Sequence, residues 1–418
     1  MTDRNNKPLV LLLGNYRPSL TLARTFKARG FDVVVSTHGC ERLCQYSAAV
    51  SSMWDHSPLK LGPARLASEL RSFAKLNPEL TAIYPVSEEY VRLIAENEPL
   101  FEGLPKIVSM DKALIQKCLD KETMLNLARS LDVPTAPFAN TNGLSDALQA
   151  CGGTGGYPKV LRPRDSTQRI DGNKAVYVEN EDELSACFDR HGLHNQPLLI
   201  QQKFEGKRHN VYFAATSGHA TKLLHAVIDR TDKIDGTGLA VEGRTLNAHH
   251  AVVEQTKTLL EALDYNGIGC AQFLVNQETG ESSFLEINPR IAGNHALPEY
   301  KGLDLGWFNF ERVFNERVDA KEVIATGGQR YCWTTGDLMG AKVAYLRKEI
   351  GLVTLIGWLI KAAVTAVRSD VHMVFDRKDP NPAIQGLWKA VPRIARWRKP
   401  LTQTDNNTDY SNNLRRPT

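Results

Sequence analysis

Residues 271–294 read AQFLVNQETGESSFLEINPRIAGN, and this stretch decides the fold of the chain. Two apolar runs flank the polar turn QETG, which predicts a β-hairpin. Because side chains two residues apart share one face of a strand, Glu286, Asn288 and Arg290 point the same way. Gln272 lies five residues before the turn and Glu286 six residues after it, so the two are expected to lie opposite each other. The sequence therefore predicts three oxygen-bearing side chains and one guanidinium on one face of the hairpin.

This set of side chains suits a hard cation. Oxygen donors with a single carboxylate leave room around Mg²⁺ (or Mn²⁺) for water and nucleotide phosphates. Arg290 adds a fixed positive charge, which can hold a phosphate or carboxylate through two parallel hydrogen bonds. The same alternation also fits an ordinary hairpin with a polar solvent face, and spacing alone does not separate the two interpretations.

The segments before the hairpin predict a parallel sheet. PLVLLLG (8–14), FDVVVS (31–36) and TAIYPVS (81–87) have the composition of buried strands, and a helix is expected at about 19–29. Strands alternating with helices are typical of a parallel sheet with helices on its faces. The turn GNYRPS after the first strand lacks the GxGxxG spacing of a dinucleotide site, which disfavours a Rossmann-type oxidoreductase.

FLEINPR, followed by IAGN and KGLDL, resembles the second ATP-binding strand pair of the ATP-grasp superfamily. The glutamine at position 272 resembles the carbamoyl-phosphate-synthase members of this superfamily, because many other relatives have glutamate there. The resemblance extends from residue 8 to about 315. It implies Gln272, Glu286 and Asn288 around Mg²⁺, with Arg290 near the transferred phosphate. The order of the segments, including the late DVHMVFDRKDPNPA, resembles the carboxylate–amine ligase branch.

The resemblance also implies residues for the phosphates of ATP. Lys121, in the dipeptide DK, would contact the α- and β-phosphates. Arg162 stands on the strand of GYPKVLRP where relatives usually have a second lysine, and Lys159 is expected on the opposite face of that strand. The loop RDSTQRIDGNK resembles a phosphate lid that is poor in glycine, with Arg169 and Lys174 as its positive charges.

The segment LLIQQKFEGKRHN resembles the hinge strand between the two lobes. By that likeness Gln201 and the backbone of Lys203 and Phe204 would meet adenine, and Glu205 or His209 would meet the ribose. An acidic residue usually follows the glycine in relatives, and this chain departs from that pattern.

The resemblance implies a two-step reaction with small-molecule carboxylate and amine substrates. The γ-phosphoryl group passes to the carboxylate, and the amine then attacks. Arg290 and Arg230 are the expected catalytic residues, Arg230 because it lies where relatives approach the acceptor. Two alternatives share the nucleotide site: a biotin-carboxylase-like enzyme that uses bicarbonate, and a nucleotide-binding module without catalysis. Arg162 and the glycine-poor lid favour the second alternative.

The expected fold class combines α/β and α+β architecture. The predicted units are a Rossmann-like domain at 1–106, a first ATP-grasp lobe with the lid at 107–200, a second lobe with the metal-binding hairpin at 201–315, a mixed C-terminal extension at 316–400, and a disordered tail at 401–418.

The composition of the chain bears on nucleic-acid binding and on cellular location. Lys and Arg are interleaved with Asp and Glu, and the net charge is only +4, so no nucleic-acid partner is expected. Seven scattered cysteines and a first apolar run that is too short for a signal peptide predict reduced thiols and a cytoplasmic location. His38, Cys40 and Cys44 lack a second ligand pair at zinc-finger spacing and are interpreted as structural.

Residues 351–367 (GLVTLIGWLIKAAVTAV) form a second apolar stretch. Lys361 and two glycines disfavour a membrane span. A buried helix is the plainer interpretation. An interfacial helix followed by PRIARWRK is the alternative, and it predicts weak contact with a membrane surface through residues 351–399. A homodimer is compatible with the sequence.

Overall fold

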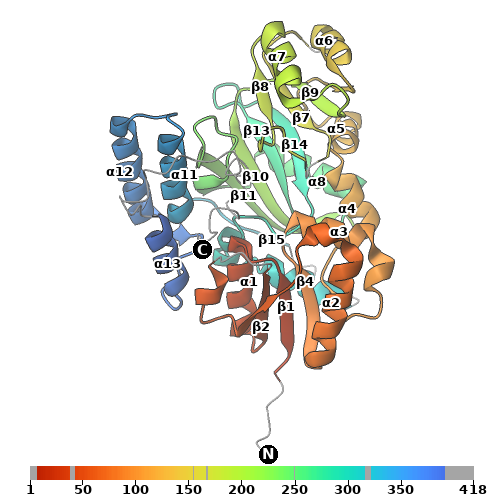
Figure 1. The fold of residues 1–418 in the computed structure, drawn as a ribbon, viewed down its shortest axis with the longest axis vertical. Helices are drawn as coiled ribbons and strands as arrows, with labels where there is room; N and C mark the ends of the chain where they lie inside the picture. The colour runs from red at the N-terminus through yellow and green to blue at the C-terminus, as the bar shows by residue number, and fades with distance from the viewer. Residues whose placement is uncertain are drawn as a thin grey trace, which may run out of the picture.

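The computed structural model describes residues 7–37, 43–153, 155–165, 168–248, 250–315 and 322–390. His38, Cys40 and the predicted tail at 401–418 lie outside these ranges. Within them the strands form three sheets, and Figure 1 shows the first sheet at one end of the molecule and the smallest sheet at the other.

The N-terminal sheet is parallel and has five strands. In spatial order they are β3 (Ser52–Asp55), β2 (Asp32–Thr37), β1 (Leu9–Leu13), β4 (Leu80–Pro85) and β5 (Lys106–Ile107). The helices of this unit are α1 (Arg17–Ala28), α2 (Pro63–Leu76) and α3 (Glu88–Glu96), with short 3₁₀ turns η1 (Cys44–Tyr46), η2 (Leu59–Leu61) and η3 (Glu98–Phe101). Strand β1 is buried on both faces: Val10 packs in the same cluster as residues of α1, and Leu11 in the same cluster as residues of α2. Burial on both faces explains the unbroken apolar run of this strand.

A small antiparallel sheet forms the next lobe. Its strands, in spatial order, are β6 (Phe138–Thr141), β9 (Leu198–Gln202), β7 (Lys159–Pro163) and β8 (Val176–Val178). Helices α6 (Leu144–Gly153) and α7 (Glu181–His191) cover one face, where Leu161, Ile200 and Phe188 share a core. The preceding helices α4 (Lys112–Leu119) and α5 (Lys121–Ser130) pack instead against the large sheet, in a cluster with Phe273 and Phe284.

The large sheet has eight strands. Along its main path they are β14 (Ser282–Asn288), β13 (Gly267–Val275), β10 (Lys207–Thr216), β11 (His219–Thr231), β12 (Ala240–Leu246), β16 (Arg330–Cys332) and β17 (Val371–His372), and β15 (Val323–Ile324) pairs with β11. Strands β15, β16 and β17 come from residues 316–400, which were predicted as a C-terminal extension. That part of the chain therefore contributes to the large sheet.

The two faces of the large sheet have different neighbours. Tyr212, Leu224 and Cys270 pack in one cluster with the N-terminal domain, and helices α9 (Ala296–Tyr300) and α10 (Leu305–Phe314) contribute to that cluster. Phe213 and Leu223 pack on the other face, together with α4, α5 and α8 (Ala251–Ala262). The strand partner of a polar residue therefore shows which of these two faces its side chain occupies.

Helices α11 (Thr334–Leu346), α12 (Leu352–Arg368) and α13 (Asn381–Ala390) lie along one side of the molecule (Figure 1). The interpretation of residues 351–367 as a buried helix is wrong, because only Leu355, Ala362 and Thr365 of α12 are buried. Val353 and Val367 are 85% and 87% exposed. Among the helices that the structure describes, none has the length and apolar character needed to cross a membrane.

Candidate functional site

The hairpin of β13 and β14 has the predicted register at its centre. Gln272 pairs with Glu286, and Cys270 pairs with Asn288. The pairing shifts between Gln272 and Phe273, so Leu285 is an extra residue in β14. This β-bulge puts Phe284 in the core and Glu286 on the opposite face. Gln272, Glu286 and Asn288 therefore share one face, as expected.

Glu286 is the negative centre of a positive cluster. Its Oε2 atom lies 3.3 Å from the guanidinium of Arg162, which comes from β7 of the small lobe, and its Oε1 accepts a hydrogen bond of 3.1 Å from Asn288. Burial alone would raise the pKa of this carboxyl. The positive charges of Lys174, Arg162 and Lys121 outweigh burial and lower its pKa to about 2. Glu286 is therefore ionised at any physiological pH, as a metal ligand must be.

Lys121 is placed by a helix cap. The side chain of Asp120 accepts a hydrogen bond from the Thr123 amide and starts α5, so Lys121 is the first residue of that helix. Lys121 is buried, and its Nζ donates to the Pro163 carbonyl at the end of β7. Burial and the nearby Arg162 lower its pKa to about 8. The charge of Lys121 near neutral pH is therefore sensitive to charges placed beside it.

Arg290 joins the cluster to the N-terminal domain. Its guanidinium lies 3.3 Å from the side-chain oxygen of Asn288 and 3.4 Å from a carboxylate oxygen of Glu88, the first residue of α3. Lys174, from the predicted lid, interacts electrostatically with Glu286, Glu88 and Arg290. The cluster thus draws on the N-terminal domain, both lobes and the lid. No pattern in the sequence connects Glu88 to this cluster, because Glu88 comes from helix α3 of the N-terminal domain.

The hinge segment lies between β9 of the small sheet and β10 of the large one. Gln201 is 4% exposed, and its Oε1 accepts a long hydrogen bond from Arg162. Lys203 donates its backbone N–H to Pro158, and its side chain pairs with the exposed Glu205 at 2.9 Å. Phe204 is half-buried beside them. As expected, Lys159 lies on the other face of β7, where it donates to Gln202.

Two residues of β10 also face the cluster, and the sequence analysis missed them. Asn210 pairs with Gln272 across the sheet, and Arg208 lies two residues before it on the same face. The Arg208 Nε and Asn210 Oδ1 atoms are buried without a hydrogen-bond partner in the described part of the chain. Only the long-range register of β10 against β13 identifies these residues, so a local pattern could not have found them.

Residues 120–310 match the family described as the carbamoyl-phosphate synthase L chain, ATP binding domain. The chain has an ATP-grasp fold. The ATP-grasp match begins at Asp120, the cap of α5, and extends past Arg290. It includes every residue of the cluster except Glu88.

Three relatives illustrate the likeness. The carbamoyl phosphate synthase large chain of Methanobrevibacter smithii is 27% identical over 209 residues, which are 47% of this chain and 19% of that one. The biotin carboxylase domain of 2-oxoglutarate carboxylase from Hydrogenobacter thermophilus, solved as a dimer with MgADP, ADP and bicarbonate, has a TM-score of 0.60 at 16% identity, over 78% of this chain and 73% of that one. The L-amino acid ligase of Bacillus licheniformis has a TM-score of 0.58 at 13% identity, over 77% of this chain and 78% of that one.

The chain spans about a fifth of the length of the synthase that it matches. The solved structures establish the ATP-grasp fold, and among them are a biotin carboxylase domain and an L-amino acid ligase. The two lobes of this fold are the small antiparallel sheet and the large mixed sheet, and the Arg162–Glu286 ion pair connects them directly.

Two expected residues are not brought into the cluster. The guanidinium of Arg230 is held by Glu242 at 2.6 Å and by both carboxylate oxygens of Asp337, so in this structure it is bound away from the cluster, and its catalytic role stays a prediction. His209 is adjacent to Asn210 in β10, so its side chain lies on the opposite face of the sheet from Glu286. The register therefore does not support the assignment of His209 to the ribose.

Proposed function

We propose that this chain is an ATP- and Mg²⁺-dependent ligase that activates a carboxylate as an acyl phosphate for attack by an amine. One observation carries the proposal: an ionised glutamate and two amide side chains share one face of a hairpin and are surrounded by Arg162, Lys121, Lys174 and Arg290. This arrangement of charges suits the triphosphate of ATP, which the basic side chains and a bound Mg²⁺ ion would hold together.

The residues present fit a magnesium ion. Gln272, Glu286 and Asn288 are oxygen donors, and a single carboxylate leaves coordination positions for phosphate oxygens and water. The side-chain nitrogen of Asn288 contacts Glu286 at 3.1 Å, and its oxygen accepts from Arg290, so this oxygen would bind the ion after the amide group turns over. When bound, the ion would neutralise charge on the phosphates and on the transferred phosphoryl group.

The basic residues would bind and orient the nucleotide. Lys121 and Lys174 supply positive charge for the phosphates, and Arg162 does so once it leaves Glu286. Gln201, the backbone of Lys203 and Phe204 at the hinge would border adenine, with Glu205 near the ribose. Catalysis of phosphoryl transfer is mainly positioning and charge stabilisation, so no protein nucleophile is needed.

Two arginines are suited to the carboxylate substrate. Arg290 and Arg208 both have a buried Nε atom without a hydrogen-bond partner in the described residues. Both lie close enough to influence the thiol of Cys270, which pairs with Asn288 at the centre of the site. Arginine binds carboxylates through two parallel hydrogen bonds, so these residues would hold the acid while it receives the phosphoryl group.

Two alternatives share the same nucleotide site. Bicarbonate could replace the organic acid, as the ligands of the Hydrogenobacter thermophilus structure suggest. The chain could also bind nucleotide without catalysis, because the Arg162–Glu286 ion pair occupies the proposed metal ligand. Each alternative predicts a different pattern of ADP release.

The test is a coupled assay of ADP release with the full chain, ATP and Mg²⁺, over pairs of carboxylates and amines. The proposal predicts release that needs both substrates. Release with bicarbonate and without an amine would favour the carboxylase. Nucleotide binding without release across the panel would favour the non-catalytic module. Arg208→Gln should raise the KM for the acid and leave the Kd for ADP unchanged, whereas Lys121→Gln should weaken ADP binding.

We also propose weak contact of α12 with an anionic membrane surface. Seven aliphatic side chains of this helix are exposed: Leu352, Val353, Ile356, Leu359, Ile360, Val364 and Val367. Lys361 lies among them, and the sequence after α13 reads PRIARWRK. An apolar helix face with adjacent basic residues is typical of interfacial binding. The same face could instead join two copies of the chain, which sedimentation in the absence of lipid would detect.

A further inference from the structure

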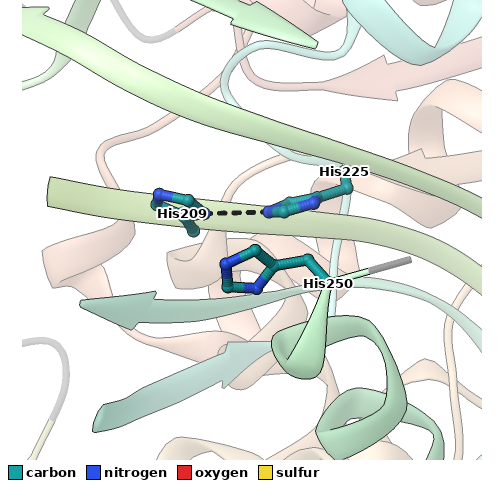
Figure 2. A group of neighbouring side chains, drawn as sticks. All are labelled: His209, His225 and His250. Atoms are coloured by element: carbon teal, nitrogen blue, oxygen red, sulfur yellow. Dashed lines mark hydrogen bonds between the residues drawn. The ribbon is translucent and has the colours of Figure 1, made fainter. Parts of the chain in front are cut away.

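Three histidines meet behind the large sheet. His209 comes from β10, His225 from β11, and His250 is the residue before α8. Their ring nitrogens, one from each, lie within 4.8 Å of one another. Figure 2 shows the three rings turned toward a common point, with a hydrogen bond of 2.9 Å between His209 Nδ1 and His225 Nε2.

This cluster is separate from the nucleotide site. His225 pairs with Val211, and His209 pairs with Phe273, so both rings lie on the face that packs against α8. Gln272 and Glu286 lie on the other face, where Arg162 contacts Glu286. A ligand of the histidines would therefore be held by residues that take no part in the proposed ATP site.

The hydrogen bonds fix which nitrogens have free lone pairs. The Nδ1 atom of His225 faces the Asn247 carbonyl, which only accepts, so the proton of this ring is on Nδ1 and its Nε2 is a lone-pair donor. His209 then donates from Nδ1, and its buried Nε2 has no partner in the described chain. The Nδ1 of His250 accepts a long hydrogen bond from the Val252 amide, which turns its Nε2 toward the pair.

The surroundings keep the rings neutral. His209 is 3% exposed and His225 is fully buried. Burial lowers the pKa of His209 to about 3 and that of His225 to about 4. Neutral imidazole is the form that binds metals. Arg244 and Lys207 are nearby positive charges, and both are paired with Asp229, which offsets their repulsion of a cation.

We infer that His209, His225 and His250 form a binding site for a divalent transition-metal ion of the Zn²⁺ class, which fastens the start of α8 to β10 and β11. Imidazole nitrogens suit Zn²⁺, whereas Mg²⁺ prefers oxygen, so the two sites would select different ions. Zn–N bonds of about 2.0–2.1 Å put tetrahedral ligand nitrogens about 3.4 Å apart, so rearrangements of about 1 Å suffice.

Binding changes the protonation of the cluster in a definite way. The His209 Nδ1 proton is released, or moves to Nε2, so that Nδ1 can coordinate. The proton of His250 moves from Nε2 to Nδ1, and the long capping bond from Val252 is lost. The contact of His225 with the Asn247 carbonyl is kept, and such a contact is the usual support for a metal-binding imidazole.

The test uses the full chain, free of affinity tags, after removal of metals with a chelator. Zn²⁺ affinity is measured by competition with a chromophoric chelator, and Co²⁺ is added as a spectroscopic probe. The variant His250→Asn removes one imidazole and retains a residue that caps helices well. His219→Asn is the matched control, because His219 is exposed at the start of β11 and outside the cluster.

The expected result is one Zn²⁺ per wild-type chain, a Co²⁺ spectrum of tetrahedral intensity, and at least about tenfold weaker Zn²⁺ binding in His250→Asn. His219→Asn should bind like the wild type. Absence of stoichiometric Zn²⁺ binding by the wild type, a weak octahedral Co²⁺ spectrum, or equal affinity in His250→Asn would overturn the inference. The wild-type measurements decide the question even if His250→Asn does not fold, and none of them depends on ATP.

Discussion

Asp337 should be one of the most important charges for the stability of this chain. Its side chain is 2% exposed and accepts hydrogen bonds from both terminal nitrogens of Arg230 and from the indole of Trp358 at 2.6 Å. The three residues belong to α11, β11 and α12, so this network fastens the C-terminal helices to the large sheet. We predict that Asp337→Asn destabilises this part of the chain.

The magnitude follows from burial. Loss of one partner from a buried ion pair costs about 3–5 kcal/mol, because the other charge stays buried. Arg230 retains Glu242 and is 15% exposed, so the lower part of this range, about 3–4 kcal/mol, is expected here. The matched control is Glu254→Gln, which breaks the exposed Lys257–Glu254 pair and should cost less than about 0.5 kcal/mol.

Urea unfolding followed by tryptophan fluorescence and circular dichroism measures both variants, and Trp358 is one of the six tryptophans that contribute to the fluorescence. An Asp337→Asn variant within about 1 kcal/mol of the wild type would refute the reasoning. That result would also mean that Arg230 is not needed to hold α11, and a role for Arg230 at the acceptor would then be favoured again.

Three further predictions concern the nucleotide cleft and α12. Because the pKa of Lys121 is lowered to about 8, this lysine loses its charge above that pH in the free protein. ADP affinity measured by calorimetry should therefore be constant below about pH 7.5 and fall by up to about tenfold per pH unit above pH 8, whereas Lys121→Gln should show no such pH dependence. Arg162→Lys keeps the charge and should retain ADP binding within about tenfold, whereas Arg162→Met should lose about 10- to 100-fold; equal losses would show that the guanidinium geometry, and not its charge, matters. Val353→Glu and Val367→Glu change the most exposed positions of α12, and each should weaken sedimentation with anionic vesicles by about tenfold. The control Leu76→Glu changes a residue of α2 that is 81% exposed, and it should leave sedimentation unchanged. A similar loss in Leu76→Glu would point to a general charge effect.

Local patterns in the sequence predicted the hairpin of β13 and β14 and three strands of the first sheet. The pairing of Gln272 with Glu286 follows from a short turn, and the register of a hairpin is set by residues that are close in sequence. The strand at Leu9–Leu13 was predicted from five consecutive apolar residues, which is what burial on two faces demands.

The errors and omissions have a common physical cause, because they depend on contacts between distant segments. The face of His209, and the positions of Asn210 and Arg208, are set by the pairing of β10 with β13, about sixty residues away. Glu88 reaches Arg290 from another domain. The apolar residues of α12 look like a core helix in sequence, and only the tertiary packing shows that most of them are exposed.

The histidine cluster illustrates the same limit. His209, His225 and His250 are separated by 16 and 25 residues, and these spacings match no common metal-binding motif. Two adjacent strands and the start of α8 bring the three rings together. The histidine and cysteine motif that the sequence does suggest is His38, Cys40 and Cys44, of which the first two lie outside the described residues.

The most direct test of the nucleotide site compares the Mg²⁺ dependence of ADP binding in the wild type and in Glu286→Gln. Calorimetric titration of each protein with ADP, with and without Mg²⁺, gives the two ratios. If Glu286 is the carboxylate that holds the ion, Mg²⁺ should strengthen ADP binding to the wild type by about tenfold or more and have little effect on the variant. Equal strengthening by Mg²⁺ in the two proteins would contradict the account.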